Sequence, residues 1–490
     1  MKKRPNLVFI MSDDHAAHAM SCYGSRINHT PHLDRIADEG MRFDNCFCTN
    51  SICTPSRATI LTGTYNHVNG VTTLDTPMDN RLQTFPKLLQ EAGYQTAIYG
   101  KWHLGEGALH KPTGFDDWAV IPGQGFYHNP TFIFPGDGGG VKRTVPGYAT
   151  DIITDMSLDF MRNRDPEKPF CLLCHHKAPH RPWYSDEKHA GMFLDGDIPE
   201  PETLFDDYSN RSKAAVLAAM RVGVHMNQED VKCEVPEAME EMEWRRWAYQ
   251  RYIKEYLRVV QSVDDNVGRL LDYLKDAGLE EDTVVVYTSD QGFFLGDHGW
   301  YDKRFMYEES LRMPFILRYP RDVKPGTVSD DIVLNADFAP LFLDLAGLPV
   351  PADMQGRSFR SILQGSTPPN WREAMYYRYW MNAAHHNVSA HYGIRTHKYK
   401  LIYYYFDGCG QAGTIKPFYC AGRNRVIQSI EGLDPEWELF DLEKDPKELN
   451  NVVYDPAYAG VFRELRDALH ALQEEVGDTR YIKDTEVTNA

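Results

Sequence analysis

The sequence lacks long hydrophobic runs, an excess of positive charge and a dense set of cysteines. Its apolar stretches fall short of the roughly 18 residues that a transmembrane helix needs, so we expect no membrane partner. The formal net charge of −18 argues against nucleic acid as a partner, because phosphate backbones bind basic surfaces. Nine cysteines among 490 residues are too few to hold the fold together as a disulfide scaffold.

The N-terminus resembles a secretion signal only superficially. Three basic residues at positions 2–4 precede an apolar stretch at 7–11, which is shorter than the roughly 7 residues of a minimal signal-peptide core. This stretch runs directly into Asp13 and Asp14. We therefore expect a cytoplasmic protein. The alternative is a periplasmic or secreted protein whose leader has been removed.

The cysteine spacing offers two local patterns. Cys171 and Cys174 form a C-x-x-C pair inside an apolar run. We favour packed thiols over redox or zinc chemistry there, because free cysteine is usually buried. Cys409 and Cys420 flank a glycine-containing stretch and could pair, although spacing alone does not show it.

The apolar pattern predicts an α/β fold with a large, mixed, mainly parallel sheet flanked by helices. Short apolar runs separated by helical patterns are typical of buried parallel strands. The strands predicted in this way are residues 6–11, 94–99, 170–174 and 284–288. Apolar residues at three- and four-residue spacing predict a long helix over 247–277, ended by Gly278.

The pattern of residue types along the sequence changes after Gly365. Residues 366–369 read as a linker, and tyrosine-rich strands follow at 375–380 and 399–406, with a closing helix near 459–475. A chain of 490 residues is long enough for two domains. We predict one large domain over residues 1–365 and a smaller α+β domain with an antiparallel sheet over 366–490.

Polar residues follow each of the four predicted strands. In an open parallel sheet, ligands bind beyond the carboxyl ends of the strands, so these residues outline one site. They are Asp13 and Asp14; Lys101 and His103; His175, His176 and His180; and Asp290 and Gln291. Three carboxylates and one amide oxygen suit Ca²⁺, with Mg²⁺ as the alternative, better than zinc. A single Asp after a strand is more often a turn or helix cap, but two acidic strand ends favour a metal site.

The segment Cys53-Thr54-Pro55-Ser56-Arg57 predicts an anion site at a helix start. Pro55 favours the first helical turn and Gly63 the end, which leaves Cys53 just before the N-terminus. Helix amides there attract negative charge, and Arg57 lies about one turn further on. A buried cysteine followed by a solvent-facing arginine is the alternative interpretation.

These segments resemble the motifs of type I sulfatases. The Cys-Thr-Pro-Ser-Arg segment continues to Leu61-Thr62-Gly63, and the remaining motifs follow in the family's order: Asp13-Asp14, Gly100-Lys101-Trp102-His103-Leu104-Gly105, Pro179-His180-Arg181-Pro182 and Ser289-Asp290-Gln291-Gly292. The resemblance spans residues 6 to about 450. It implies an alkaline phosphatase-like fold, a bound calcium ion, and oxidation of Cys53 to formylglycine (3-oxoalanine) by a maturation enzyme.

The resemblance also implies roles for individual residues. Formylglycine at position 53 is the nucleophile and a metal ligand, and Arg57, Lys101 and Lys303 hold the sulfate or the activated residue. His103 takes the proton that releases sulfate, and His180 serves the leaving alcohol. His175 and His176 are expected to be supporting or core residues. Gln291 departs from the Asn or His common in the family at this metal position.

Across its length the chain looks most like bacterial carbohydrate sulfatases related to N-acetylglucosamine-6-sulfatases, and less closely like iduronate-2-sulfatases. This favours a sulfated sugar as substrate. Aromatic residues such as Trp183, Trp380 and Tyr392 could stack on sugar rings, and His391 and Arg395 are candidate substrate contacts from the second domain. The alternatives are a phosphonate or phosphate ester hydrolase of the same superfamily, a non-catalytic binder of sulfated glycans, and a two-zinc phosphatase.

Overall fold

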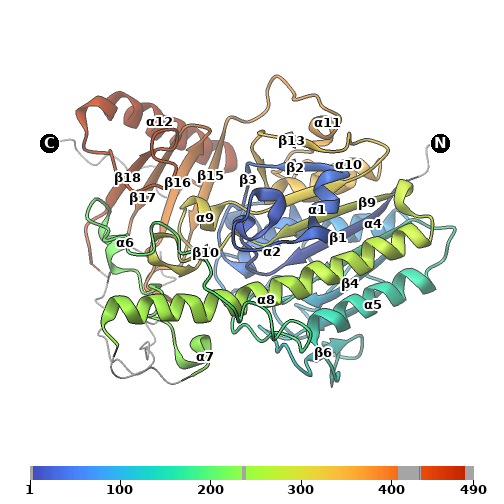
Figure 1. Ribbon diagram of the computed structural model, residues 1–490. Coiled ribbons are helices and arrows are strands. Elements are labelled where there is room, and N and C mark those ends of the chain that lie inside the picture. Colours follow the sequence, from blue (N-terminus) through green and yellow to red (C-terminus); the bar gives the residue numbers. More distant parts are fainter. Residues whose placement is uncertain (1–3, 234–238, 407–429, 431, 480–490) are drawn as a thin grey trace.

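A computed structural model describes residues 4–233, 239–406, 430 and 432–479. Most of the chain builds one ten-stranded sheet covered by helices, and a separate four-stranded sheet lies at one end of it (Figure 1). The strand order of the large sheet is β13-β2-β12-β9-β1-β8-β4-β5-β6-β7. Its five central strands, β9-β1-β8-β4-β5, are mutually parallel.

The central strands are buried because both faces of the sheet are covered, which is why their sequences are continuously apolar. The strands of the large sheet are β1 (Asn6–Ser12), β2 (Met41–Phe43), β4 (Gln95–Lys101), β5 (Asp117–Ile121), β6 (Thr131–Phe134), β7 (Val141–Thr144), β8 (Phe170–His175), β9 (Thr283–Ser289), β12 (Phe315–Arg318) and β13 (Thr327–Ser329). Two short pairs lie outside it: β3 (Cys46–Phe47) with β14 (Val333–Leu334), and β10 (Phe294–Leu295) with β11 (Tyr301–Asp302).

The longer helices beside the large sheet form two groups, and within each group the helices contact one another. One group is α1 (Pro31–Asp38), α5 (Ala149–Asn163) and α8 (Glu241–Asp276); the other is α2 (Cys53–Thr62), α4 (Phe85–Glu91) and α10 (Phe338–Leu345). Short helices occupy the connections: α3 (Asn66–Asn69), α6 (Lys213–Leu217), α7 (Gln228–Val231), α9 (Glu308–Leu311) and α11 (Arg360–Leu363). In Figure 1, α8 and α5 run side by side along the sheet.

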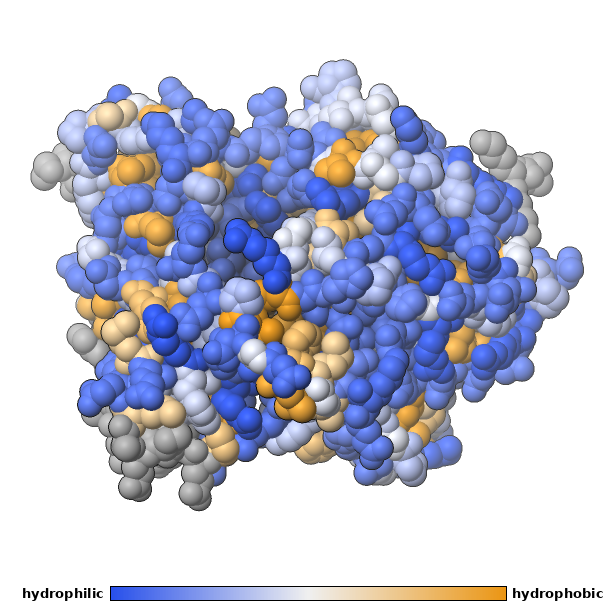
Figure 2. All heavy atoms as spheres, viewed as in Figure 1, coloured by the Kyte–Doolittle hydropathy of each residue, from blue (hydrophilic) through white to orange (hydrophobic). Residues whose placement is uncertain are grey.

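The C-terminal sheet is antiparallel, with the order β15-β16-β17-β18. Its strands are β15 (Ala374–Tyr379), β16 (His391–Thr396), β17 (Tyr399–Tyr404) and β18 (Glu436–Asp441), and α12 (Ala459–Val476) packs on it. The predicted domain boundary at residue 365 stays a prediction. The face shown in Figure 2 is largely hydrophilic, with hydrophobic side chains gathered near its centre.

The four parallel strands and the mixed α/β fold predicted from the sequence are confirmed. The long helix begins earlier than expected, at Glu241 instead of Trp247. Cys171 and Cys174 are buried free thiols, as predicted, while Cys409 and Cys420 lie outside the described residues. Among the described helices, none is both long and apolar enough to cross a membrane.

Candidate active site

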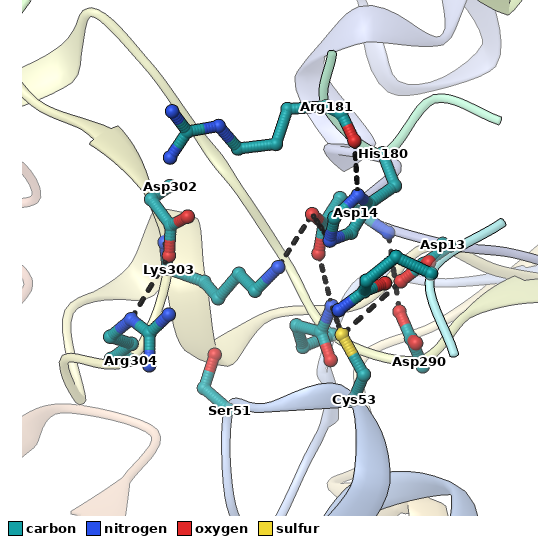
Figure 3. Close-up of polar contacts among 12 residues, drawn as sticks. Asp13, Asp14, Ser51, Cys53, His180, Arg181, Asp290, Asp302, Lys303 and Arg304 are labelled. Atoms are coloured by element: carbon teal, nitrogen blue, oxygen red, sulfur yellow. Dashed lines mark hydrogen bonds and ion pairs between the residues drawn. The ribbon is translucent and has the colours of Figure 1, made fainter. Parts of the chain in front are cut away.

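The predicted site residues meet at the carboxyl edge of the large sheet. The strands β1, β4, β8 and β9 are parallel neighbours, so the residues that follow them emerge at the same edge. There they face the N-terminus of α2, which begins at Cys53 and ends where Gly63 adopts a φ of +67°. Figure 3 shows the side chains of this edge pointing toward one another.

Three aspartates form a compact, fully buried cluster. One carboxylate oxygen from each of Asp13, Asp14 and Asp290 lies within 4.8 Å of the other two. Asp14 adopts a φ of +69°, and its backbone N–H donates to Asp290 Oδ1 at 3.2 Å. Burial, with the charge of Asp290 adding to it, raises the pKa of Asp14 to about 6, although Lys303 opposes the shift.

The amide of Gln291 completes this cluster. Its Nε2 donates to Asp14 Oδ1, whereas its Oε1 is buried and has no hydrogen-bond partner among the described residues. A buried acceptor without a partner is costly, and a cation would satisfy it. Three carboxylates and this amide oxygen are the hard donor set that suits Ca²⁺ or Mg²⁺, so the residues present fit such an ion.

Cys53 lies directly against the aspartate cluster. Its Sγ donates to Asp13 Oδ1 at 3.3 Å, and Gln291 Nε2 lies 3.8 Å from the same sulfur. Burial raises the pKa of the Cys53 thiol to about 12, so the group is a neutral thiol at neutral pH. The unmodified cysteine is therefore poorly suited to act as a thiolate nucleophile.

Each aspartate has a basic partner. Lys101 pairs with Asp13, Lys303 Nζ lies 2.6 Å from Asp14 Oδ2, and Arg57 Nε lies 2.9 Å from Asp290 Oδ2. Arg57 Nη2 is buried and makes no hydrogen bond among the described residues; it lies 3.9 Å from Asp13 Oδ1. This donor is available to an oxyanion, and the predicted role of Arg57 in binding one stays a prediction.

Two histidines border the cluster. His180 Nε2 lies 3.8 Å from Asp14 Oδ2, and its Nδ1 donates to the Arg181 carbonyl at 2.6 Å. His103, with a φ of +56°, places Nδ1 3.4 Å from Thr54 Oγ1. Burial lowers the pKa of both imidazoles well below the usual range, and Lys101 adds to the effect. Both rings are therefore neutral at neutral pH and able to accept a proton.

Sequence reasoning missed three residues of this site. Gln124 Oε1 accepts a hydrogen bond from Lys101 Nζ at 2.5 Å, and Tyr127 Oη donates to the His180 carbonyl at 2.6 Å. Both follow β5, a strand that the apolar pattern did not identify. The third is Lys177, which is 1% exposed and stands over the Tyr127 ring. Its position between His176 and the Pro179-His180 motif was the available signal.

The predicted substrate contacts of the C-terminal region have other partners. His391 is fully buried between aromatic rings, including Tyr377 and Tyr404, and Arg395 is ion-paired with Glu308 at 3.2 Å. Both side chains lie on the face of β16 that packs inward. Substrate binding by His391 and Arg395 stays a prediction, and their burial and existing partners argue against it. The proposed stacking aromatics are buried as well: Trp183, Trp380 and Tyr392. His175 and His176 are core residues, as predicted.

Comparison with known proteins settles the family. Residues 5–348 match the sulfatase family, and residues 296–410 and 421–475 match the C-terminal part of N-sulphoglucosamine sulphohydrolase. The chain belongs to the sulfatase family. Members of this family generally use Ca²⁺ and formylglycine, and the aspartate cluster beside Cys53 offers a place for both.

Relatives of this sulfatase include enzymes that act on sulfated glucosamine. An N-acetylglucosamine-6-O-sulfatase of Bacteroides thetaiotaomicron is 44% identical, covering 97% of this chain and 87% of that protein. The human N-acetylglucosamine-6-sulfatase is 28% identical over 77% of this chain and 67% of its own length. A structure solved with its substrate D-glucosamine-2-N,6-O-disulfate is 42% identical, with a TM-score of 0.89, covering 98% of this chain and all of that one.

The fold is shared with a phosphonate monoester hydrolase. The phosphonate monoester hydrolase of Agrobacterium radiobacter is 21% identical, with a TM-score of 0.73, covering 96% of each chain. At this identity the likeness shows the shared fold alone. It agrees with the large parallel sheet and the separate small sheet predicted from the sequence.

Proposed function

We propose that this sulfatase hydrolyses a 6-O-sulfate ester on a glucosamine-type sugar. The observation that carries the reaction is the placement of Cys53, at the N-terminus of α2, against three buried aspartates and three basic side chains. The choice of sugar is supported by the 44% identical N-acetylglucosamine-6-O-sulfatase and by the substrate complex of the 42% identical structure.

Two groups supply the chemistry that side chains alone lack. A maturation enzyme would oxidise Cys53 to formylglycine, whose hydrate would offer a hydroxyl nucleophile towards sulfur. Asp13, Asp14, Asp290, Gln291 and residue 53 would hold a calcium ion, which would offset the negative charge of the sulfate. Arg57 and Lys101 orient the sulfate, with the unpartnered Arg57 Nη2 available to one oxygen. Lys303 holds Asp14 in place and adds positive charge.

The histidines have separate proton roles in this proposal. His103 lies beside Thr54, next to residue 53, so it removes the proton of the formylglycine hydrate whose second hydroxyl carries the sulfate. His180 donates from Nδ1 to the Arg181 carbonyl, which orients Nε2 toward the site. There, when the ring is protonated, Nε2–H donates to the oxygen of the leaving sugar.

The test begins with the chemical state of residue 53. Protein from the native host is digested, and mass spectrometry establishes whether residue 53 is cysteine or formylglycine. The same preparation is assayed with calcium against 6-O-sulfated N-acetylglucosamine and against an aryl phosphate, with Cys53→Ala as the matched control. We expect formylglycine and calcium-dependent sulfate release, both abolished in the control. An intact cysteine in active protein would contradict the mechanism, and turnover of the phosphate ester alone would contradict the substrate class.

A further inference from the structure

Four basic side chains lie buried around the site, and three of them have an acidic partner. The paired ones are Lys101 with Asp13, Lys303 with Asp14 and Arg57 with Asp290. The fourth is Lys177, which is 1% exposed. Among the described residues, no carboxylate lies within the 4.0 Å of an ion pair from its ammonium group. The site therefore holds one positive charge that the protein does not balance locally.

The ammonium of Lys177 lies on the His180 side of the site. Its Nζ donates to the Arg181 carbonyl at 3.3 Å, and the same carbonyl accepts a hydrogen bond from His180 Nδ1 at 2.6 Å. The ring of Tyr127 lies beneath Nζ, with its centroid 4.8 Å away, and its Oη donates to the His180 carbonyl. Lys177 and His180 are thus held together by one short segment of backbone.

This environment is incomplete for a buried cation. An ammonium group has three N–H donors, and here one carbonyl and one aromatic face receive them. Burial lowers the pKa of Lys177 to about 7, even though Asp14 and residue 53 oppose the shift. Its charge in turn helps to lower the pKa of Lys101, His103 and His180. An anion at the centre of the site would supply the missing acceptor and the missing charge.

We propose that Lys177 is a further substrate-binding residue, whose ammonium donates to an oxygen of the bound sulfate ester on the His180 side. This inference rests on the proposed function, because it takes the anion to be a sulfate ester. In this proposal Lys177 binds the ester near its leaving oxygen. Arg57 and Lys101 bind the sulfate oxygens nearest residue 53.

The chain offers a matched control in Lys232. This lysine also stands over a tyrosine ring, 4.5 Å from the centroid of Tyr184, and also donates to a backbone carbonyl, that of Trp183. Unlike Lys177, it has a carboxylate partner, Glu255 Oε2, at 2.8 Å. Its charge is therefore balanced within the protein, and it needs no ligand.

The experiment compares Lys177→Met, Lys177→Arg and Lys232→Met. Binding of 6-O-sulfated N-acetylglucosamine is measured by calorimetry with calcium in a Cys53→Ser background, which cannot form formylglycine. The steady-state kcat and KM are measured in the mature enzyme. We expect Lys177→Met to weaken binding about 10- to 100-fold, as for the loss of a charged hydrogen bond. Lys177→Arg should recover part of the affinity, and Lys232→Met should stay within about twofold of the parent.

Each outcome decides the inference. Unchanged affinity for the sulfated sugar in a folded Lys177→Met protein would overturn it, as would an equal loss in Lys232→Met. If Lys177→Met does not fold, Lys177→Gln makes the same comparison, because it keeps a donor without the charge. If the Cys53→Ser protein binds the sulfated sugar through Lys177 but the mature enzyme releases no sulfate, the proposed function fails while this inference stands.

Discussion

Gln291 is the candidate metal ligand at which this chain differs from the Asn or His that the family resemblance predicts. Its buried Oε1 has no partner among the described residues, although the three aspartates beside it are paired with basic groups. The extra methylene of glutamine, relative to asparagine, changes the reach of the amide. Ligation by Gln291 is therefore testable separately from ligation by the aspartates.

We predict that Gln291→Ala weakens calcium binding about tenfold, because one neutral oxygen is lost while three carboxylates remain. Asp290→Ala should weaken it further, since it removes a charged ligand and leaves Arg57 without its partner. Calcium-dependent shifts of the thermal unfolding midpoint measure both affinities. Equal calcium affinity in Gln291→Ala and the parent protein would show that Gln291 is not a ligand.

The loop between β5 and β6 is the element that links the sheet edge to the surface of the molecule. Gln124 contacts Lys101 and Tyr127 contacts the His180 carbonyl, so the loop is anchored twice to the site. Gly125 adopts a φ of +66°, and a Cβ there would lie 2.1 Å from Ile121 Cγ2, which fixes the local path of the chain. Between these anchors, Phe126 is 73% exposed.

An exposed aromatic ring on an anchored loop beside the site is suited to stack on a sugar ring. We predict that Phe126→Ala lowers kcat/KM for a sulfated oligosaccharide several-fold more than for a small aryl sulfate. Leu109→Ala, which removes another exposed apolar side chain, is the control. Parallel kinetics on the two substrates give the ratio. If Phe126→Ala leaves that ratio unchanged, the ring does not contact the glycan.

The turn between β10 and β11 contains a buried histidine with a pH-dependent contribution to stability. Burial of His298 lowers its pKa, but Asp206 and Glu309, 3.3 and 3.6 Å away, outweigh this and raise the pKa to about 9. The folded pKa lies above the unfolded value of 6.5. The protonated ring therefore stabilises the fold fully below pH 6.5, and this stabilisation is lost as the pH rises toward 9.

We predict that the stability difference between the parent protein and His298→Gln is largest near pH 6 and shrinks by about 1–3 kcal/mol at pH 9. Denaturant unfolding at the two pH values measures it. Taking the difference between the two proteins removes the contribution of groups that titrate in both. A difference that is the same at both pH values would contradict the pairing of His298 with Asp206 and Glu309.

At the scale of the whole molecule, the parallel core was predictable because its strands are buried on both faces and read as apolar runs. The strands β5, β6 and β7 on one side of the large sheet and the C-terminal strands β16 and β18 were not, since they mix polar and apolar residues. The candidate metal ligands follow strand ends, so their meeting at one edge of the sheet could be predicted. The fates of His391 and Arg395 could not, because they depend on which face of β16 packs against a distant segment.

That packing joins the C-terminal sheet to the large domain through buried charges. Lys400 of β17 is fully buried, with Nζ 3.0 Å from Glu308 of α9 and 2.6 Å from Glu448. Arg395 and Arg312 also pair with Glu308. Burial raises the pKa of Glu448 to about 7, although Lys400 opposes the shift. Glu308 thus has three basic partners, whereas the charge of Glu448 is compensated by Lys400.

We predict that Lys400→Met destabilises the protein by about 3–5 kcal/mol, because it removes the ammonium group that compensates buried Glu448. Lys398→Met, which removes an exposed lysine paired with Glu443, should have little effect. The double variant Lys400→Met with Glu448→Gln should recover part of the loss, since it also removes the carboxylate charge that Lys400 compensated. Denaturant unfolding measures all three. A loss in Lys400→Met no larger than in Lys398→Met would mean that apolar packing, and not this charge network, holds the C-terminal sheet to α9.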